Sequence, residues 1–380
     1  MIIAADWIGR APTRAVCRAL EAAGHRALFV GGCVRNAILG LPVADVDIAT
    51  DAHPGEVVEL ATAAGLKAVP TGIDHGTVTV VAEGIPHEVT TFRRDIETFG
   101  RHARVAFSTE VAEDAARRDF TMNALYAAPD GRVIDPLGGL PDLLARRVRF
   151  VGDPSTRIAE DYLRILRFFR FHAWYGDPAQ GIDAEGLAAC ATMAEGIGRL
   201  SRERVGAEMR RLLSAPDPGP AVAAMTSTGV LNRVLPGSDP AALPRLVHLE
   251  AGRSPRWLSR LAVLGGTGEA EALRLSRSEA AELHRIRSEL DSGRGPAELG
   301  YRLGPDLAQD VMLCRAALAG TDLSEDDAAQ IAAGAVARFP LRAADLMPGL
   351  QGPALGAALR AAENRWIASD FRLGRDELLG

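Results

Sequence analysis

The stretch FVGGCVRNAILGLPVADVDIATD, residues 29–51, decides the fold of the first third of this chain. An apolar strand over 27–30 runs into Gly31 and Gly32, and a short helix follows. Paired glycines let backbone N–H groups approach phosphate oxygens closely, and the N-terminus of a helix adds positive potential. Arg35 can add a bidentate grip on the same oxygens. The stretch therefore predicts a phosphate-binding turn between a strand and a helix.

A pair of acidic residues follows ten residues after Arg35, in the segment Asp45-Val46-Asp47 at the start of the next expected strand. Alternate residues of a strand point to the same face, so the two carboxylates should converge. Two like charges held together need a divalent cation, and metal-dependent phosphoryl transfer requires such a pair. Asp45 and Asp47 are thus predicted catalytic metal ligands. The alternative is a solvated acidic pair near a strand end.

Helix and strand patterns alternate through the first 140 or so residues, which predicts a small domain with both kinds of element. The expected helices cover 12–23, 38–41 and 54–64, and the expected strands cover 27–30, 46–49, 76–81 and 86–93. After Pro141 the strand patterns nearly vanish, and four Pro/Gly-rich breaks separate helical segments. We therefore expect an α+β fold with four parts: a head over 1–140, a helical neck over 141–215, a body over 216–292 and a tail over 293–380.

Composition restricts the classes of protein that this chain can belong to. Its 380 residues are too many for one ordinary core, and 47% apolar with 24% charged residues is typical of a folded soluble protein. The net charge of −6 argues against a protein that wraps nucleic acid non-specifically, so any such contact must come from local patches. Four scattered cysteines, no signal-peptide pattern and no apolar stretch of membrane-spanning length predict a cytoplasmic protein without a membrane segment.

A second candidate site is the segment RRDFTMNAL at 117–125. Arg118, Asp119 and Asn123 stand just before an expected apolar helix and could bind a triphosphate and a ribose. A capped helix start with solvated charges is the alternative.

A third candidate is GDPSTRIAEDYLRILRFFRF at 152–171, which predicts one helix with Asp153 as N-cap and Pro154 in its first position. At about 100° per residue, one face is apolar and the other is charged. The apolar face holds Ile158, Tyr162, Ile165, Leu166 and Phe169, and the charged face holds Arg157, Glu160, Asp161, Arg164 and Arg167, with Arg170 at its edge. A salt-bridged, solvated face is the alternative to a binding surface.

Asp161 and Arg164 on the charged face have the right chemistry to select a base. Cytosine and adenine each show an amino donor beside a ring-nitrogen acceptor, whereas guanine and uracil show a carbonyl beside a ring N–H. A carboxylate only accepts and a guanidinium only donates. Asp161 and Arg164 together therefore complement C and A and oppose G and U.

The motifs GGCVRNAILG, DVDIAT, HEVTTFRRD and RRDFTMNAL, in this order, resemble the head domain of class II tRNA nucleotidyltransferases and bacterial poly(A) polymerases. These belong to the DNA polymerase beta nucleotidyltransferase superfamily. The resemblance continues through 160–171 and 201–213 and covers roughly 25–215. It implies a polymerase-beta-like head with a mixed sheet, followed by all-α neck, body and tail. It also implies Mg²⁺-dependent transfer of a nucleotidyl group from CTP or ATP to a tRNA that lacks its 3′-terminal CCA.

The resemblance also assigns roles to individual residues. It implies catalytic roles for Asp45, Asp47 and, as a third carboxylate, Glu88, and metal ligation by Asp45 and Asp47. The nucleotide-binding residues that we expect are Gly31, Gly32, Arg35, Arg118, Asp119, Asn123, Glu160, Asp161, Arg164, Arg167 and Arg170. One departure is visible, because the family usually has Asp where this chain has Asn36. The segment 91–107, with Arg93, Arg94, Arg101 and Arg104, looks like the family's flexible loop or a surface hairpin loop.

Three alternatives stay open. The first is a bacterial poly(A) polymerase, which usually carries a basic G-R-[RK]-F segment shortly after the Asp-x-Asp strand. The corresponding stretch 68–81, AVPTGIDHGTVTVV, has no such cluster, which favours CCA addition. The second is an A-adding or CC-adding tRNA nucleotidyltransferase. The third is a non-catalytic RNA-binding protein, against which the presence of both Asp45 and Asp47 counts.

Overall fold

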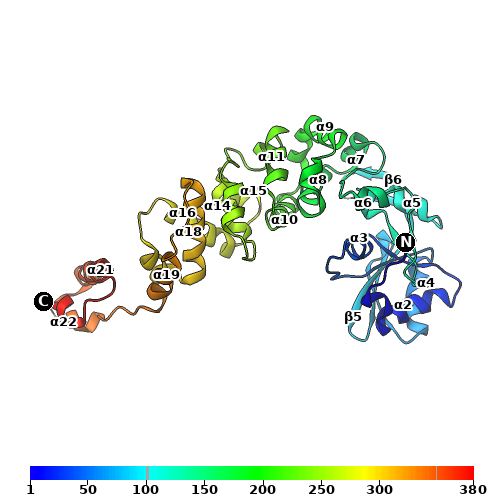
Figure 1. Ribbon diagram of the computed structural model, residues 1–380. Coiled ribbons are helices and arrows are strands. Elements are labelled where there is room, and N and C mark those ends of the chain that lie inside the picture. The colour runs from blue at the N-terminus through cyan, green and yellow to red at the C-terminus, as the bar shows by residue number, and fades with distance from the viewer. Residues whose placement is uncertain (100–101, 348) are drawn as a thin grey trace. The chain divides into compact units, whose positions relative to one another are not determined.

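The computed structural model describes residues 1–99, 102–347 and 349–380 and divides into two compact units, Met1–Val234 and Leu235–Gly380 (Figure 1). The first unit contains the expected head and neck together with two more helices, and the elements that the structure describes in the second unit are all helices. This α+β architecture confirms the predicted fold class. The finer boundaries expected near 140, 215 and 292 stay a prediction.

A seven-stranded mixed sheet forms the centre of the first unit, with strand order β3-β4-β5-β2-β1-β8-β9. The strands β2 and β5 run parallel, and all other neighbours run antiparallel. The strand bounds are β1 Ala27–Val30, β2 Asp47–Thr50, β3 Lys67–Gly72, β4 Thr77–Ala82, β5 Ile85–Thr91, β8 Tyr126–Ala127 and β9 Val133–Ile134. The β2–β5 pair matters most, because it brings two segments with predicted site residues side by side.

Helices α2 (Ala11–Glu21) and α4 (Pro54–Ala63) lie against this sheet (Figure 1). Side chains of β4 alternate between buried and half-buried, as expected for a strand with one covered face. In β5, buried His87 faces α2, where its Nε2 lies 3.1 Å from the Thr13 hydroxyl oxygen. Because neighbouring strand residues alternate, Glu88 points to the opposite, open face.

The segment after RRDF differs from the expected apolar helix. It contains one 3₁₀ turn, η2 (Thr121–Asn123), and then β8, which pairs with β1. The apolar run there is only five residues long and ends before Pro129, so it can complete a buried strand but not a helix. A separate two-stranded sheet consists of β6 (Arg93–Phe99) and β7 (His102–Phe107), which agrees with the hairpin alternative for 91–107. The predicted loop residue Arg101 lies outside the described residues.

The neck contains two helices where the sequence predicts one, namely α7 (Pro154–Glu160) and α8 (Leu163–Tyr175). The break lies at Asp161, whose φ of −154° and ψ of 106° are extended. The expected N-cap is correct, because Asp153 Oδ1 accepts from the Thr156 backbone N–H at 2.7 Å. The expected apolar face is also largely correct, since Ile158, Ile165, Leu166 and Phe169 are fully buried and Tyr162 is half-buried.

The remaining elements are helices. In the first unit they are α1 Asp6–Gly9, α3 Gly32–Ile38, η1 Ile73–His75, α5 Val111–Ala116, α6 Leu140–Leu144, η3 Pro178–Gln180, α9 Ala184–Thr192, η4 Ala194–Arg199, α10 Arg202–Leu213, α11 Gly219–Ser227 and α12 Val230–Val234. In the second unit they are α13 Leu243–Leu249, α14 Trp257–Leu264, α15 Glu269–Ala272, α16 Arg277–Leu290, α17 Pro296–Leu303, α18 Pro305–Ala319, α19 Asp327–Val336, α20 Ala343–Leu346, α21 Gly352–Ala368 and α22 Arg375–Leu379. Within the described ranges, no helix combines the length and apolar character needed to cross a membrane. All four cysteines are buried free thiols.

Candidate active site

The acidic edge of the sheet holds Asp47 and Glu88 as direct neighbours. They are register partners in the parallel β2–β5 pair, so their side chains leave the sheet on the same face. Asp45 is exposed and lies before β2, not within it. The expected convergence of the Asp45 and Asp47 carboxylates on one strand face therefore cannot come from strand alternation. The sheet therefore pairs Asp47 with Glu88 directly and brings Asp45 to the site through the preceding loop.

The electrostatics of Asp47 show that the three carboxylates interact. Burial raises the pKa of Asp47 to about 6, the charges of Glu88 and Asp45 add to this rise, and Arg118 opposes it. A raised pKa means that negative charge at this position is unfavourable until a cation or a donor compensates it. The site therefore carries surplus negative charge next to a cationic side chain.

These carboxylates suit a hard divalent cation. Hard cations such as Mg²⁺ prefer oxygen ligands and commonly take one or two carboxylates plus substrate phosphates. Asp45, Asp47 and Glu88 make no ion pair within 4.0 Å with any described residue, so their oxygens are not already neutralised. Across the described ranges, however, no group of three or more acidic, His or Cys side chains is placed so that it could hold a metal ion by itself. The donor set thus fits a cation that completes its coordination with phosphate and water.

The turn between β1 and α3 contacts the same region. Gly31 has φ 71° and ψ −118°, a conformation that residues with a side chain rarely adopt. A Cβ at Gly31 would lie 3.3 Å from Nη1 of Arg118, so the glycine also lets that guanidinium approach the turn. Gly32 begins α3, and a Cβ there would make only an ordinary contact. The predicted turn between a strand and a helix is therefore present, with Gly31 as its conformationally demanding residue, and phosphate binding at this turn stays a prediction.

Two side chains hold the Arg118 guanidinium in place at this turn. Its Nη2 donates to Asp114 Oδ2 at 3.0 Å, and its Nε donates to the Tyr126 hydroxyl at 3.2 Å. The Tyr126 hydroxyl in turn donates to Asp114 at 2.6 Å. Asp114 is buried and accepts from both the Arg118 guanidinium and the Tyr126 hydroxyl, so the position of the guanidinium is fixed. The other N–H groups of Arg118 remain available at the turn.

A chain of hydrogen bonds joins Arg35 of the head to Arg167 of the neck. Arg35 Nη1 donates to Asn123 Oδ1 at 2.5 Å, and Asn123 Nδ2 donates to Asp119 Oδ1 at 2.9 Å. Arg167 donates Nε to Asp119 Oδ2 at 2.8 Å and makes a second bond through Nη2. Four predicted nucleotide-binding residues are thus brought together. Asp119 and Asn123 are buried in this network, and a ribose contact by either stays a prediction.

The charge of Asp119 is strongly stabilised by its partners. Burial alone would raise its pKa, but Arg167, Asn123 and the Phe120 backbone N–H lower it to about 2. Removing the Arg167 or the Asn123 side chain would leave the buried charge of Asp119 poorly compensated, which would lower the stability of the fold. The head and neck are therefore joined here by a connection that depends on an ionised carboxylate.

Glu160 and Arg164 form an ion pair at the end of α7. Glu160 accepts from Nη1 of Arg157 at 2.8 Å and from Nη1 of Arg164. Arg164 also donates to the Arg157 backbone oxygen at 2.7 Å, and Arg157 donates to the Arg118 backbone oxygen at 2.8 Å. Arg157, expected on the exposed face, is therefore buried between the neck and the segment that carries Arg118.

Asp161 is held separately from Arg164. Its Oδ2 accepts from Nη2 of Arg204 in α10 at 2.6 Å, and its Oδ1 accepts from the Leu163 backbone N–H at 3.1 Å. The single continuous helix expected here is wrong, because the chain is extended at Asp161, and the Arg164 backbone N–H donates to the Asp161 backbone oxygen. Each carboxylate oxygen has a second lone pair, so Asp161 can still accept from a base.

Arg170 does not lie at the edge of a polar face. It is buried, its Nε donates to Glu208 Oε2 of α10 at 2.5 Å, and its guanidinium lies 4.5 Å from the centre of the Phe171 ring. A direct role in nucleotide binding stays a prediction that this placement does not favour.

Three residues that were not predicted from the sequence contact predicted site residues, namely Tyr175, Arg204 and Glu208. Arg35 lies over the Tyr175 ring at 4.0 Å and donates to its hydroxyl at 2.8 Å. Tyr175 follows Arg167 by eight residues on α8, and this spacing places both residues on one helix face. The spacing is therefore a sequence signal by which Tyr175 could have been found. Arg204 and Glu208 carry no comparable signal, because their partners lie about forty residues away.

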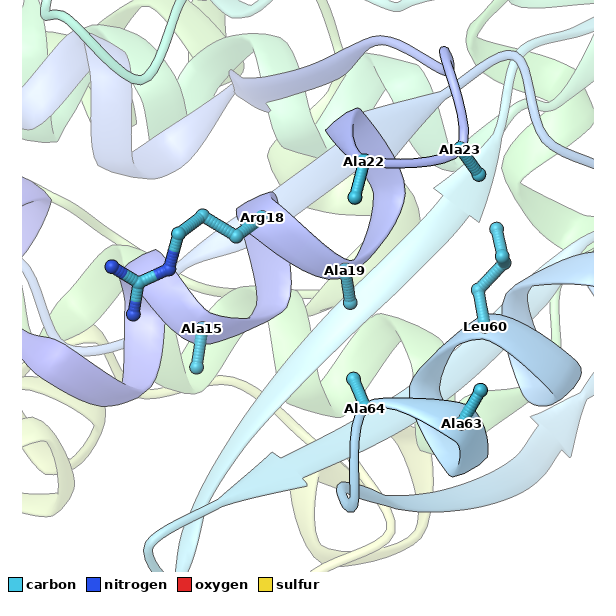
Figure 2. Close-up of a pocket in the computed structure, with 8 residues that line it drawn as sticks. All are labelled: Ala15, Arg18, Ala19, Ala22, Ala23, Leu60, Ala63 and Ala64. Atoms are coloured by element: carbon cyan, nitrogen blue, oxygen red, sulfur yellow. The ribbon is translucent and has the colours of Figure 1, made fainter.

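An apolar groove elsewhere on the head has none of this chemistry. Figure 2 shows it between α2 and α4, lined by Ala15, Arg18, Ala19, Ala22, Ala23, Leu60, Ala63 and Ala64. Its lining contains no acid and none of the predicted site residues. The candidate active site is therefore the acidic edge of the sheet together with the neck, not this groove.

Two family models match parts of this chain. The family model "Poly A polymerase head domain" matches residues 27–149, which include the acidic edge and the RRDF segment. The model "Probable RNA and SrmB- binding site of polymerase A" matches residues 181–241.

Three similar proteins cover different shares of the chain. The CCA-adding enzyme of Lacticaseibacillus paracasei is 45% identical over 204 residues, 53% of this chain and 50% of that protein. A crystal structure of the Bacillus stearothermophilus CCA-adding enzyme in complex with CTP has TM-score 0.75 and 30% identity, covering 95% of this chain and 94% of that one. The Thermotoga maritima CCA-adding enzyme complexed with a tRNA has TM-score 0.68 at 19% identity, covers 96% of this chain and 92% of that one, and shares the fold. This chain spans about half the length of the curated relatives that it matches.

Proposed function

The chain belongs to the family of class II tRNA nucleotidyltransferases and bacterial poly(A) polymerases, and we propose that it adds C, C and A to the 3′ end of tRNA. CTP and ATP are the substrates, and tRNA that lacks its 3′-terminal CCA is the acceptor. The observation that supports this proposal is the hydrogen-bonded link between the segment that carries Arg118 and the neck. Arg157 donates to the Arg118 backbone oxygen, and Arg164 donates to the Arg157 backbone oxygen.

Asp45 and Asp47 hold Mg²⁺ in this proposal, and Glu88 lies beside them. A bound divalent cation lowers the barrier to attack by the RNA 3′-hydroxyl and stabilises negative charge on the transferring phosphate. Burial and the acidic neighbours that raise the pKa of Asp47 make its negative charge unfavourable until a cation compensates it, so a divalent ion would stabilise the ionised carboxylate. The exposed position of Asp45 leaves room for phosphate on the same side.

Arg35 and Arg118 orient the triphosphate. Both guanidiniums are held from behind, Arg35 by Asn123 and Tyr175 and Arg118 by Asp114 and Tyr126. A guanidinium fixed in this way loses little conformational freedom when it binds phosphate, so the triphosphate meets a pre-organised surface.

Asp161 and Arg164 act as the template. Asp161 accepts the exocyclic amine of C or A, and Arg164 donates to the neighbouring ring nitrogen. Glu160 orients Arg164, and Arg204 orients Asp161. Because these side chains cannot move along with the RNA, addition stops when the growing end fills the pocket. We also place the protein in the cytoplasm, which its four free buried thiols support.

The proposal is tested by incubating the protein and Mg²⁺ with one labelled nucleotide at a time. The acceptors are tRNA lacking CCA, tRNA ending in C-C and an unstructured RNA. We expect CTP to extend only the first, ATP to extend the second, and UTP and GTP to extend neither. Adenylate added to the unstructured RNA would indicate a poly(A) polymerase. Addition of A alone or of C alone would indicate an A-adding or CC-adding enzyme, and no addition would indicate a non-catalytic RNA-binding protein.

A further inference from the structure

We propose that Asn36 is a positioning residue that connects Arg35, which binds the triphosphate, to the loop before the metal ligands by hydrogen bonds. Because its amide is neutral, Asn36 does this without compensating the positive charge of Arg35. This inference rests on the proposed function, because it concerns how the nucleotide is held. The family usually has Asp at this position, so the residue is a departure that belongs to this chain.

The two ends of the Asn36 side chain have different partners. Its Oδ1 accepts from Nε of Arg35 at 3.1 Å and from Nη2 at 2.9 Å. Its Nδ2 donates to the Pro42 backbone oxygen at 2.8 Å. The orientation of the amide follows from these partners, because a guanidinium can only donate and a backbone carbonyl can only accept.

A carboxylate could not replace both contacts. Asp at this position would accept from Arg35, but its second oxygen would face the Pro42 carbonyl, and two acceptors at hydrogen-bond distance repel each other. The contact at Pro42 lies in the segment between α3 and β2, which also carries Asp45. The amide of Asn36 therefore holds this segment to the end of α3, reinforced by a 2.8 Å bond from the Leu41 backbone N–H to the Asn36 backbone oxygen.

The charge of Arg35 follows from the same contacts. Its guanidinium is bonded to Asn36, Asn123 and Tyr175, all of which are neutral. The nearest acid in this network, Asp119, is bonded to Arg167 instead of Arg35. Arg35 is only 7% exposed, so its charge is poorly screened by water. A buried cation with neutral partners keeps its full attraction for the phosphates of a nucleotide.

Asn36→Asp tests this inference against Asn36→Ala. We expect Asn36→Asp to raise the Kd for CTP and the KM for both CTP and ATP about fivefold or more, since a charge-assisted pair would compete with phosphate. Asn36→Ala removes both hydrogen bonds but adds no charge, so its KM should rise only about twofold. The ratio of the CTP effect to the ATP effect should stay near one, because Arg35 is expected to contact phosphate and not base.

The controls separate this inference from a folding defect and from failure of the proposed function. Asn364→Asp makes the same charge change at an exposed position of α21, and it should leave the Kd for CTP unchanged. CTP binding is measured by calorimetry with Mg²⁺ and without tRNA, so it reports on Arg35 even if no transfer occurs. Equal CTP affinity in Asn36→Asp and wild type, or equal losses in Asn36→Asp and Asn36→Ala, would overturn the inference. A wild-type protein that binds CTP but adds nothing to tRNA would instead contradict the proposed function.

Discussion

Asp47 is the single residue on which the transfer should depend most, because it is both half-buried and adjacent to Glu88. We predict that Asp47→Asn lowers nucleotide addition by at least about a thousandfold and leaves tRNA affinity nearly intact, because charge stabilisation at the reacting phosphate is lost. Single-turnover rates and filter binding measure the two quantities. Asp130→Asn, on an exposed turn of the same head, is the matched control and should be as active as wild type. Substantial activity in Asp47→Asn would remove the metal assignment.

Discrimination between the four nucleotides should depend on Asp161 and Arg164 more strongly than the rate of nucleotide addition does. Each lost charge-assisted hydrogen bond is worth roughly 1.5–3 kcal/mol, which is about ten- to a hundredfold in discrimination. We predict that Asp161→Ala and Arg164→Ala admit UTP and GTP at measurable rates on tRNA lacking CCA, while addition itself continues. Unchanged rejection of UTP and GTP in both variants would mean that these side chains serve only the ion pairs with Arg204 and Glu160.

Asp119 should make the first unit sensitive to acid. Its pKa is about 2 in the folded state against an ordinary value of 3.8, so its contribution to stability is complete above about pH 4 and is lost as the pH falls toward 2. The shift corresponds to about 2 kcal/mol. We predict that Asp119→Asn is less stable than wild type at pH 5 and that the gap narrows between pH 4 and pH 2. Denaturant unfolding at several pH values measures this, and a constant gap would contradict it.

At the scale of single elements, the sequence predicted well those strands whose apolar pattern is unambiguous. The expected strands over 27–30 and 46–49 match β1 and β2 to within one residue, and those over 76–81 and 86–93 match β4 and β5 to within two. Strand β3 was missed because its side chains are half-buried or exposed and include Pro70, so they show no apolar alternation. Strand β8 was mistaken for a helix because a short buried apolar run has no diagnostic period.

The break between α7 and α8 could not be predicted, since the apolar spacing continues across it. Its cause is tertiary, because Tyr162 at the break lies against the 3₁₀ helix η4. A Cβ on Gly196 of that helix would lie 1.9 Å from Cδ1 of the Tyr162 ring. Only a glycine leaves room for Tyr162 in this position, and the sequence alone gives no indication that the two residues meet.

Gly196 therefore provides a test at this scale. We predict that Gly196→Ala displaces Tyr162, destabilises the first unit by about 1–3 kcal/mol and weakens discrimination against UTP, because Asp161 precedes Tyr162 directly. Gly198→Ala in the same 3₁₀ helix is the matched control, since a Cβ there has nothing within 4 Å. Thermal unfolding and misincorporation assays measure the two effects. Equal behaviour of both alanine variants would show that the close contact does not hold the break in place.

At the scale of the whole chain, the sequence identified most of the site residues but not the contacts between them. Arg35 reaches Asn123 across 88 residues, and Arg167 reaches Asp119 across 48. No periodicity or local spacing contains such pairs, because the first arises only when the head folds and the second only when the neck packs against the head. The same limit explains why Arg157 and Arg170, which spacing places on a polar face or at its edge, are buried in ion pairs.

The product of the reaction reports most directly on the proposed template, because a template made of side chains must stop addition when its pocket is full. The decisive measurement is the length and 3′ sequence of the product formed from tRNA lacking CCA with Mg²⁺ and saturating CTP and ATP. We predict one product, three nucleotides longer and ending in C-C-A, with no further growth on prolonged incubation. Long adenylate tails, on this tRNA or on an unstructured RNA supplied with ATP alone, would contradict the claim.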